Sequence, residues 1–310
     1  MHVLISGGTG FIGKHLVEEL LLHRYQVTVL TRNSNKITLG ASNHNMQKGY
    51  RVVDWKYLAE NQEFAQTVDC IVNLSGETIN GRWTKAKKTR ILESRVSTTQ
   101  KIIDAIATGR VTPKLLINGS AIGIYGDRDD EKVTEESQLG YGFLSEICKT
   151  WEQLACKAQA YNVRVVLLRT GVVLGKNGGA LEKLVLPYRL HVGGTLGNGS
   201  QWSSWIHLKD LVGLIRFAIE NDQLQGPLNG TSPNPVTMHS FGRMIGKTIK
   251  THSLFQVPGL LLRVILGEMA DLILHSQRVI PKKAIEQGYV FQYPELETAL
   301  QNILIDTPSS

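Results

Sequence analysis

Cysteine is scarce in this sequence of 310 residues, which holds three: Cys70, Cys148 and Cys156. No two of them have the short spacing of a zinc ligand pair or a redox dithiol, and their number is odd. We therefore expect no metal site and no disulfide framework, and free thiols are typical of a reducing compartment. An apolar strand that begins at residue 2 leaves no room for a signal peptide. These features predict a cytoplasmic protein.

Long hydrophobic runs and blocks of positive charge are also missing. The most apolar late stretch, residues 257–274, is interrupted by Arg263, Glu268 and Asp271, which favours a packed helix over a membrane span. The net charge is +7, but no cluster of arginine and lysine is interleaved with aromatic residues. We therefore expect no membrane and no nucleic-acid partner, and attribute the positive charge to a phosphate-rich cofactor and an acidic substrate.

A glycine motif opens the chain. Gly7, Gly10 and Gly13 are spaced at intervals of three residues, between the apolar run Val3–Ile5 and an amphipathic stretch at 16–21. This order predicts a strand, a tight turn and a helix whose free N–H groups face a pyrophosphate. Gly7 permits the turn, Gly10 lets the phosphates approach the backbone, and Gly13 lets the helix pack on the strand. The cofactor contacts predicted here are Gly7, Thr9, Gly10, Phe11, Ile12 and Gly13.

The end of the second strand selects between the two nicotinamide cofactors. Residues 26–30 form an alternating apolar strand that ends in Thr31 and Arg32, and no Asp or Glu is present to bind an adenosine ribose. Arg32 offers a planar set of donors suited to a 2′-phosphate, so we predict NADP(H). Asp54, at the end of the third strand, either contacts the adenine or is a plain turn residue.

Strand and helix patterns alternate along the first half of the chain, which predicts an α/β protein with a doubly wound parallel sheet. The ends of parallel strands line the ligand crevice, so we expect Leu74, Ser75 and Gly76 beside the cofactor's ribose and pyrophosphate. Arg95 lies in the following helix on the half that faces the sheet. It either binds a cofactor phosphate or belongs to a solvated face.

Several motifs together resemble the extended, atypical short-chain dehydrogenases/reductases, a family that includes nucleotide-sugar epimerases and dehydratases. Three segments carry this resemblance: Ile5–Gly13, Leu168–Gly175 and Trp205–Asp210. The match is closer to the NADP-binding epimerase-like branch, as further motifs suggest. These are Gly81-Arg82-Trp83, Trp151-Glu152, Gly193-Gly194 with Gly197, Ser276–Pro281, Gly288-Tyr289 and Tyr293–Glu297.

The resemblance implies a Rossmann-type sheet domain plus a smaller C-terminal substrate domain, with the active site between them. We expect the NADP-binding domain over residues 1–175, with a return segment near 207–232. The substrate domain then comprises residues 176–206 and 233–305. Val173 is expected beside the cofactor. Relatives often pair through helices resembling Ala86–Ala107 and Ser145–Tyr161, so we expect a monomer or a homodimer.

The family's acid/base pair, a tyrosine and a lysine four residues apart on one helix face, is not evident. The corresponding segment offers Leu144 and Cys148, or Ser145 and Lys149 if the register shifts by one. In the family a serine or threonine hydroxyl assists this pair. Ser120 is a candidate for that hydroxyl, although it lies five residues before Tyr125, one more than the usual spacing.

Four substitutes for the missing tyrosine can be named. Tyr125 and Tyr141 lie near the expected chemistry, Ser145 with Lys149 offers a proton relay, and His207 lies in the linker between the two parts. For each, a structural role is the alternative. Trp202 and Trp205 either line a substrate pocket or anchor the linker. The catalytic candidates are Ser120, Tyr125, Ser145 and Lys149.

Two functions remain open. The complete cofactor motif favours an NADP(H)-dependent oxidoreductase or epimerase acting on a small polar metabolite, such as a sugar derivative or another carbonyl compound. The missing tyrosine favours a non-catalytic protein that senses NADP(H) or regulates a partner. A serine hydrolase is excluded, because the glycine before Ser120 is adjacent to it rather than two residues away.

Overall fold

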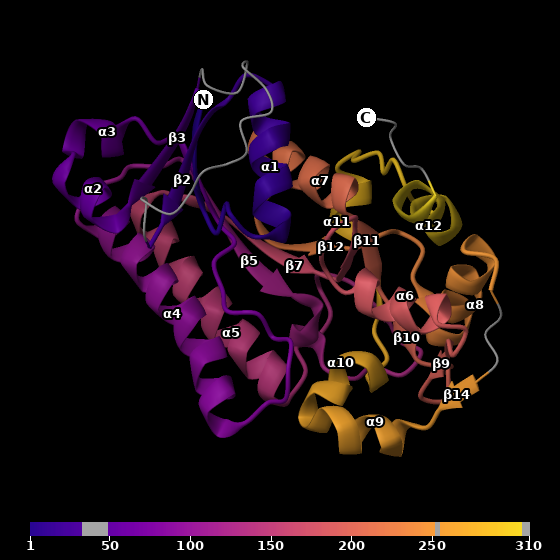
Figure 1. Ribbon diagram of the computed structural model, residues 1–310. Helices are drawn as coiled ribbons and strands as arrows, with labels where there is room; N and C mark the ends of the chain where they lie inside the picture. Colours follow the sequence, from indigo (N-terminus) through magenta and orange to yellow (C-terminus); the bar gives the residue numbers. More distant parts are fainter. Residues whose placement is uncertain (33–48, 252–254, 306–310) are drawn as a thin grey trace.

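The centre of the molecule is a sheet of parallel strands (Figure 1). The computed structural model describes residues 1–32, 49–251 and 255–305, so the loop expected at 33–50 lies almost entirely outside the described residues. In that described part, seven strands pair in the order β12-β7-β5-β4-β1-β2-β3. The Rossmann-type, doubly wound sheet expected from the sequence is confirmed. The strands are β1 His2–Ser6, β2 Gln26–Thr31, β3 Tyr50–Asp54, β4 Cys70–Asn73, β5 Leu115–Ala121, β7 Arg164–Thr170 and β12 Gly226–Gly230.

Helices cover both faces of this sheet, because successive apolar residues of each strand point to opposite sides. Val3 and Ile5 pack under helices α1 (Phe11–Leu22) and α7 (Leu208–Glu220). Leu4 packs in a second core with the helices of the other face. Those helices are α2 Trp55–Glu60, α3 Gln62–Gln66, α4 Lys85–Ala107 and α5 Phe143–Cys156, the last continued by the 3₁₀ helix η4 Lys157–Tyr161.

The strand order reverses between β1 and β4, where successive connections leave for opposite sides of the sheet. In sheets of this kind the carboxyl ends of the strands open into a ligand crevice at that point. Helix α1 begins there, directly after β1, and the 3₁₀ helix η3 (Ile122–Tyr125) follows β5. The candidate site is therefore built from the ends of β1, β2, β4 and β5.

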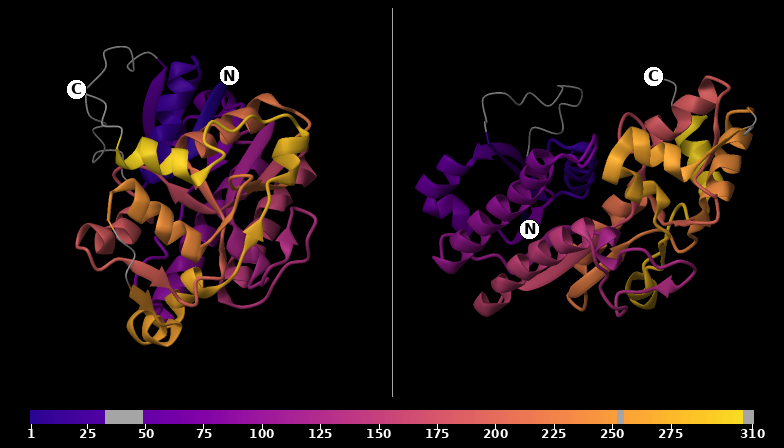
Figure 2. Two further views of the ribbon diagram at one scale, coloured as in Figure 1. Left: turned by 90° about the vertical axis from the view of Figure 1, so that its right-hand side faces the viewer. Right: turned by 90° about the horizontal axis from the view of Figure 1, so that it is seen from below.

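A second group of helices surrounds its own core at one end of the molecule, where Figure 2 shows the orange and yellow segments gathered. Helices α6 (Leu181–Arg189), α8 (Met238–Thr248) and α12 (Leu296–Leu304) bury one another's apolar residues. The short-strand pairs β8–β11 and β6–β15 tie this group to the sheet part, and the pairs β9–β14 and β10–β13 lie within the group. Their bounds are β6 Lys132–Val133, β8 Val172–Leu174, β9 Gly194–Leu196, β10 Trp202–Ser203, β11 Trp205–His207, β13 Val236–Thr237, β14 Phe255–Val257 and β15 Arg278–Val279.

The apolar segment expected to be one packed helix at 257–274 is instead broken into three pieces. Helix α9 (Gly259–Leu266) ends where Gly267 takes a φ of +63°, a left-handed conformation that glycine adopts without strain. A 3₁₀ turn, η5 (Gly267–Ala270), and helix α10 (Asp271–Leu274) complete the segment. A short helix, α11 (Lys282–Glu286), follows further along the chain.

Two local features differ from what the sequence patterns predict. The glycine-punctuated stretch after Gly175 predicts a loop, but it contains helix α6, which includes Pro187. Asp210 is of a type that often caps helices, but the cap of α7 is His207, whose Nδ1 accepts a hydrogen bond from the Lys209 N–H. Asp210 is buried and instead accepts hydrogen bonds from the N–H groups of Gln292 and Tyr293. None of the helices within the described ranges has the length and apolarity to cross a bilayer.

Candidate functional site

The glycine turn after β1 has the geometry that a phosphate-binding loop requires. Gly7 has a φ of +84°, and a Cβ there would lie 2.8 Å from the Leu74 carbonyl carbon. A Cβ on Gly13 would overlap the Gly7 carbonyl oxygen, so both positions exclude larger residues. A Cβ on Gly10 would meet only that same oxygen, at 3.3 Å, and otherwise points into open space. The backbone at Gly10 is thus accessible to a ligand.

The N-terminus of helix α1 carries unsatisfied donors. The N-cap residue, Gly10, has no side chain that could accept a hydrogen bond from the first N–H groups of the helix, and the first turn contains no acidic residue. The N–H groups of Phe11 and Ile12, together with the helix dipole, therefore favour an anion in front of this turn. Thr9 and Gly10 are exposed beside it. A pyrophosphate fits this cradle, in agreement with the sequence expectation.

The end of β2 presents Arg32 to solvent. Its guanidinium makes no ion pair or hydrogen bond with the described residues, whereas Thr31 is half-buried and paired in register with Asp54. Asp54 caps helix α2, since its Oδ1 accepts a hydrogen bond from the Tyr57 N–H at 2.8 Å. Arg32 is therefore available to a ligand at the sheet edge, and the turn role that the sequence allowed for Asp54 is the one observed.

The end of β4 lies beside the glycine turn. The Ser75 and Ser6 hydroxyl oxygens are 2.5 Å apart, and Leu74 covers Gly7. Gly76 is exposed, and a Cβ there would lie 3.0 Å from the Arg95 guanidinium carbon. The end of β4 thus brings backbone groups, the Ser75 hydroxyl and the Arg95 guanidinium to the crevice beside the glycine turn.

Arg95 is held in place without a carboxylate partner among the described residues. Its guanidinium donates to the carbonyl oxygens of Ile91 and Glu77 and lies 5.1 Å from the centroid of the Trp151 ring. Burial lowers the pKa of this guanidinium. A half-buried cation without a counter-ion suits a phosphate, one of the two roles that the sequence left open for it.

The loop after β8 covers the far end of the cradle. A Cβ on Gly178 would lie 2.5 Å from the Phe11 ring, and a Cβ on Gly175 or Gly179 would lie 2.9 Å from the same ring. Phe11 therefore packs under this loop, and its contribution to the cofactor site is its backbone N–H. Val173 is half-buried in β8, next to Ile206 of β11.

The face of α5 that meets the end of β5 is apolar. A Cβ on Gly123 would lie 3.2 Å from the Leu144 Cβ, and Cys148 is buried with Ile122 and Tyr125, against Ala121. Burial raises the pKa of the Cys148 thiol to about 11, so it is a neutral packing residue. Leu144 and Cys148 are thus the residues that occupy the four-residue spacing on this face, and they offer no proton donor of suitable strength.

The structure does not bring Ser145 and Lys149 together as a proton relay. Ser145 is fully buried, and its hydroxyl donates to the carbonyl oxygens of Ile124 and Gly140. The Lys149 ammonium pairs with Glu146 at 2.8 Å and lies near the Tyr141 ring. Each residue makes local contacts on a different side of α5, so the relay geometry is not present in this structure, and a catalytic role for either residue stays a prediction.

Ser120 and Tyr125 belong to a buried polar network rather than to a reaction site. The Ser120 hydroxyl donates to Glu152 at 2.6 Å, and Glu152 accepts two hydrogen bonds from Arg169, at 2.9 and 2.8 Å. Arg169 also donates to the Tyr125 hydroxyl, which donates to Asn229 at 2.7 Å. Burial raises the pKa of Tyr125 to about 12, and its side chain is fully inaccessible. Both hydroxyls are thus bound to protein groups, and a catalytic role for Ser120 or Tyr125 stays a prediction.

The remaining candidates separate into exposed and buried groups. Tyr141 is 88% exposed, whereas His207 is buried and stacked on Tyr293 with ring centroids 4.0 Å apart. Burial, with a smaller effect of Lys209, lowers the pKa of His207 to about 4, so the ring is neutral and structural. Trp205 is in the core, and its indole N–H donates to the Asn234 carbonyl.

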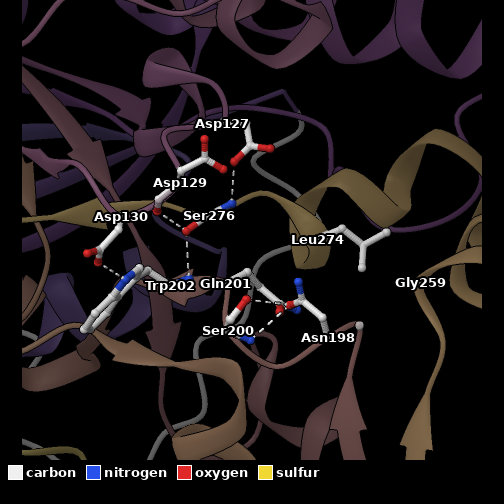
Figure 3. Close-up of a pocket in the computed structure, with 11 residues that line it drawn as sticks. Asp127, Asp129, Asp130, Asn198, Ser200, Gln201, Trp202, Gly259, Leu274 and Ser276 are labelled. Atoms are coloured by element: carbon white, nitrogen blue, oxygen red, sulfur yellow. Dashed lines mark hydrogen bonds between the residues drawn. The ribbon is translucent and has the colours of Figure 1, made fainter.

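Trp202 lines a polar pocket of about 650 Å³ between the sheet part and the C-terminal helices (Figure 3). A pocket at Trp202 was one of the two alternatives that the sequence allowed, but the other walls were missed, because they come from segments far apart in the chain. Two sequence features could have indicated the pocket: the acidic loop after Tyr125, and the serine-glutamine pairs near residues 200 and 276. The lining residues are Asp127, Asp129, Asp130, Gly197, Asn198, Ser200, Gln201, Trp202, Gly259, Leu274 and Ser276.

Comparison with known proteins agrees with this geometry. Residues 3–229 match the NAD dependent epimerase/dehydratase family, and residues 257–303 match a domain of unknown function, DUF1731. The chain belongs to the NAD-dependent epimerase/dehydratase family. The resemblance to the extended, epimerase-like dehydrogenases/reductases is thereby confirmed.

Family members similar to this chain match it over nearly its whole length. It is 40% identical to the Epimerase family protein YfhF of Bacillus subtilis, over 99% of each chain. It is 38% identical to the SDR39U1 homolog, chloroplastic, of Arabidopsis thaliana, over 98% of this chain and 87% of the relative. The crystal structure of human SDR39U1 (isoform 2) with NADPH superposes with a TM-score of 0.84 at 31% identity, covering 98% and 99% of the two chains.

Proposed function

We propose that this family member binds NADP(H) along the ends of β1, β2 and β4. The observation that carries the proposal is the uncapped N-terminus of α1, where the backbone at Gly10 is open to a pyrophosphate. Arg32 would hold the 2′-phosphate, and Arg95 a further phosphate oxygen, because neither guanidinium has a carboxylate partner among the described residues. The human relative crystallised with NADPH supports the choice of cofactor.

We further propose that the protein is an oxidoreductase or epimerase acting on a small polar molecule. The molecule would lie between two domains, the NADP-binding domain (residues 1–175 and 207–232) and the substrate domain (residues 176–206 and 233–305). When bound, the cofactor supplies a hydride to a carbonyl carbon, or accepts one from an alcohol carbon. Leu144 and Cys148 place no proton donor at the end of β5, so the proton for the carbonyl oxygen would come from the substrate or from a water molecule that enters with it. The cytoplasm suits the three free thiols, and we propose a monomer or homodimer without membrane or nucleic-acid partners.

A specific observation supports a second candidate, a non-catalytic NADP(H) sensor. The four named catalytic candidates, Ser120, Tyr125, Ser145 and Lys149, are each committed to other protein groups. A protein that holds NADP(H) without an acid or base beside it would report the cofactor through the contacts of loop 175–179 on Phe11.

Absorbance at the nicotinamide band separates the two candidates. Purified protein is mixed with NADPH and, in turn, with sugars, ketones and quinones. NADPH consumption that scales with enzyme and with one carbonyl class supports the oxidoreductase. Tight NADPH binding supports the sensor only if no class causes consumption and if the same sugars, incubated with NADP⁺, give no epimer by chromatography, because an epimerase returns the hydride and consumes no net cofactor.

A further inference from the structure

Helix α9 presents large apolar side chains to solvent. Four of its eight residues lie on one face with exposed fractions of 77% for Leu260, 47% for Leu261, 66% for Val264 and 60% for Ile265. The helix packs on the rest of the protein through the opposite face, where Leu262 is buried. Figure 1 shows α9 at the lower edge of the molecule. A contiguous exposed apolar patch is typical of an interaction surface, and we call these four residues the α9 strip.

The helices through which relatives often pair offer no such surface. In the described part of the chain, none of the exposed large apolar side chains lies on α4 or α5. The exposed positions of these helices hold residues such as Glu93 and Lys101 on α4, and Glu146 and Gln153 on α5. Contact between two such polar faces would remove little apolar surface from water. The α9 strip is therefore the better surface for contact between two copies of this chain.

The order of residues along the α9 strip makes it complementary to itself. When two copies of α9 cross in antiparallel orientation about a two-fold axis, Leu260 faces the partner's Ile265, and Leu261 faces the partner's Val264. Every side chain of the strip then meets an apolar side chain, and the two helix dipoles oppose each other favourably. Arg263 beside the strip is paired with Asp271 at 2.8 Å, so it brings no unpaired charge to this contact.

The surroundings of the two ends of α9 carry opposite charges. At the first residue, Gly259, the helix borders the polar pocket, whose wall includes the acidic segment 127–130. At the other end, a Cβ on Gly267 would lie 3.5 Å from the Arg82 side chain. A helix of this length spans about 12 Å, so the acidic and basic groups lie on either side of the α9 strip.

The charges at both ends are only partly neutralised within the chain. At the acidic end, Arg278 pairs with Asp130, whereas Asp127 and Asp129 form no ion pair with any residue that the structure describes. At the basic end, Lys88 pairs with Glu268. Arg82 is exposed there, without a carboxylate partner in the described ranges.

An antiparallel crossing brings the basic end of one copy against the acidic end of the other, twice in each dimer. A stable interface buries about 800 Å² on each partner, which a helix of two turns does not supply alone. The charged ends extend the contact beyond the apolar strip, and the exposed Leu272 of α10 adds apolar surface. The apolar contact and the charged contacts therefore favour the same arrangement of two copies.

We propose that the protein forms a two-fold symmetric homodimer through the α9 strip, with Arg82 of each copy against segment 127–130 of the other. This inference selects the homodimer from the two states proposed above. It does not depend on NADP(H) binding.

Sedimentation velocity of the full chain over a series of concentrations tests the dimer. We expect a species with twice the mass of one chain. Val264→Glu and Leu261→Lys should each raise the dissociation constant at least about hundredfold, because each variant places two unpaired charges in the apolar contact. The matched control Val290→Glu alters an apolar side chain that is 82% exposed outside α9, and it should leave the dimer unchanged.

The antiparallel arrangement predicts a further result. A mixture of the Val264→Glu and Leu261→Lys variants should recover a dimer, because the two new side chains then face each other with opposite charge. Arg82→Glu should raise the dissociation constant by about tenfold, since it reverses two symmetric charged contacts. No recovery in the mixture, or an unchanged dimer in Arg82→Glu, would contradict this arrangement.

Three other results would overturn the inference. The first is a single-chain mass at all concentrations up to about 100 µM. The second is a dimer that survives Val264→Glu and is lost in Thr150→Arg, which would place the contact on α5. The third is a monomer that sediments with vesicles of phosphatidylglycerol and phosphatidylcholine, which would assign the α9 strip to a membrane surface.

Circular dichroism shows whether each variant is folded, and a titration with NADPH tests the cofactor proposal separately. Because the α9 strip lies outside the glycine turn, the variants should bind NADPH as the unaltered chain does. If the unaltered chain forms the dimer and does not bind NADPH, the cofactor proposal fails and the assignment of the α9 strip stands.

Discussion

The carbonyl oxygen of Gly7 occupies the space that a Cβ on Gly13 would need. This contact holds the first turn of α1 against the end of β1, and it explains why the third glycine of the motif cannot be enlarged. Gly10, between them, faces outward with only one atom near its missing Cβ. Substitutions at Gly13 are therefore expected to affect stability, and substitutions at Gly10 are expected to affect ligand binding.

We predict that Gly13→Ala destabilises the fold by about 1–3 kcal/mol or more, because backbone must move to admit the methyl group. Gly10→Ala should remain folded with reduced affinity for NADPH, because its methyl group projects to the side where the cofactor approaches. Urea denaturation and calorimetry measure the two effects. The interpretation fails if Gly10→Ala loses stability and keeps full affinity.

Removal of the Arg32 guanidinium should weaken NADPH binding by about tenfold or more, since a hydrogen bond to a charged group contributes roughly 1.5–3 kcal/mol. Arg32→Ala should leave NADH binding nearly unchanged, because NADH lacks the 2′-phosphate. Arg110→Ala is the matched control: it removes another exposed arginine, in the connection between α4 and the amino end of β5, away from the carboxyl ends of the strands. Equal loss of NADPH affinity in both variants would point to general charge rather than to a phosphate contact.

The buried pair of Glu152 and Arg169 should matter for stability and not for chemistry. Their side chains are 8% and 4% exposed, so Glu152→Ala leaves a buried, unpaired guanidinium and should cost about 3–5 kcal/mol. Glu60→Ala, which removes an exposed pair with Lys56, should cost at most about 1 kcal/mol. Urea denaturation of both variants measures the difference, and similar losses would contradict the structural role assigned to the network.

Stability should fall as the pH is lowered from about 6.5 to about 4, in part because of His207. Its folded pKa is lowered to about 4, against about 6.5 when unfolded, so the unfolded chain binds the proton more readily. The stability present above pH 6.5 is therefore lost as the pH falls, by up to about 3 kcal/mol for this group. His207→Asn keeps a cap acceptor on α7 and should flatten this part of the profile. An unchanged pH profile in the variant would contradict the role given to the ring.

The local parts of the fold were predictable from sequence. The glycine spacing at Gly7–Gly13 and the apolar strands each depend on neighbours a few residues away, and the structure agrees with them. Helix α6 was not found, because Pro187 and the surrounding glycines are typical of loops and only packing against α8 stabilises it. The break at Gly267 was likewise hidden within an apolar run.

The shape of the glycine turn in the candidate site was predictable, and the cofactor contacts predicted around it stay predictions. Ser120, Tyr125 and Ser145 have residue types suited to catalysis, but their partners Glu152, Asn229 and the Gly140 carbonyl come from distant positions in the chain. The polar pocket at Trp202 depends in the same way on segments near residues 130, 200 and 275 meeting in space. Such tertiary contacts leave no periodic pattern in the sequence.

The most direct test of the central claim is a calorimetric titration of the purified protein with NADPH and then with NADH. The geometry of Gly10 and Arg32 predicts that both bind and that NADPH binds at least about tenfold more tightly, because only NADPH carries the phosphate for Arg32. Absence of binding by either nucleotide, or equal affinity for both, would contradict the account of this crevice.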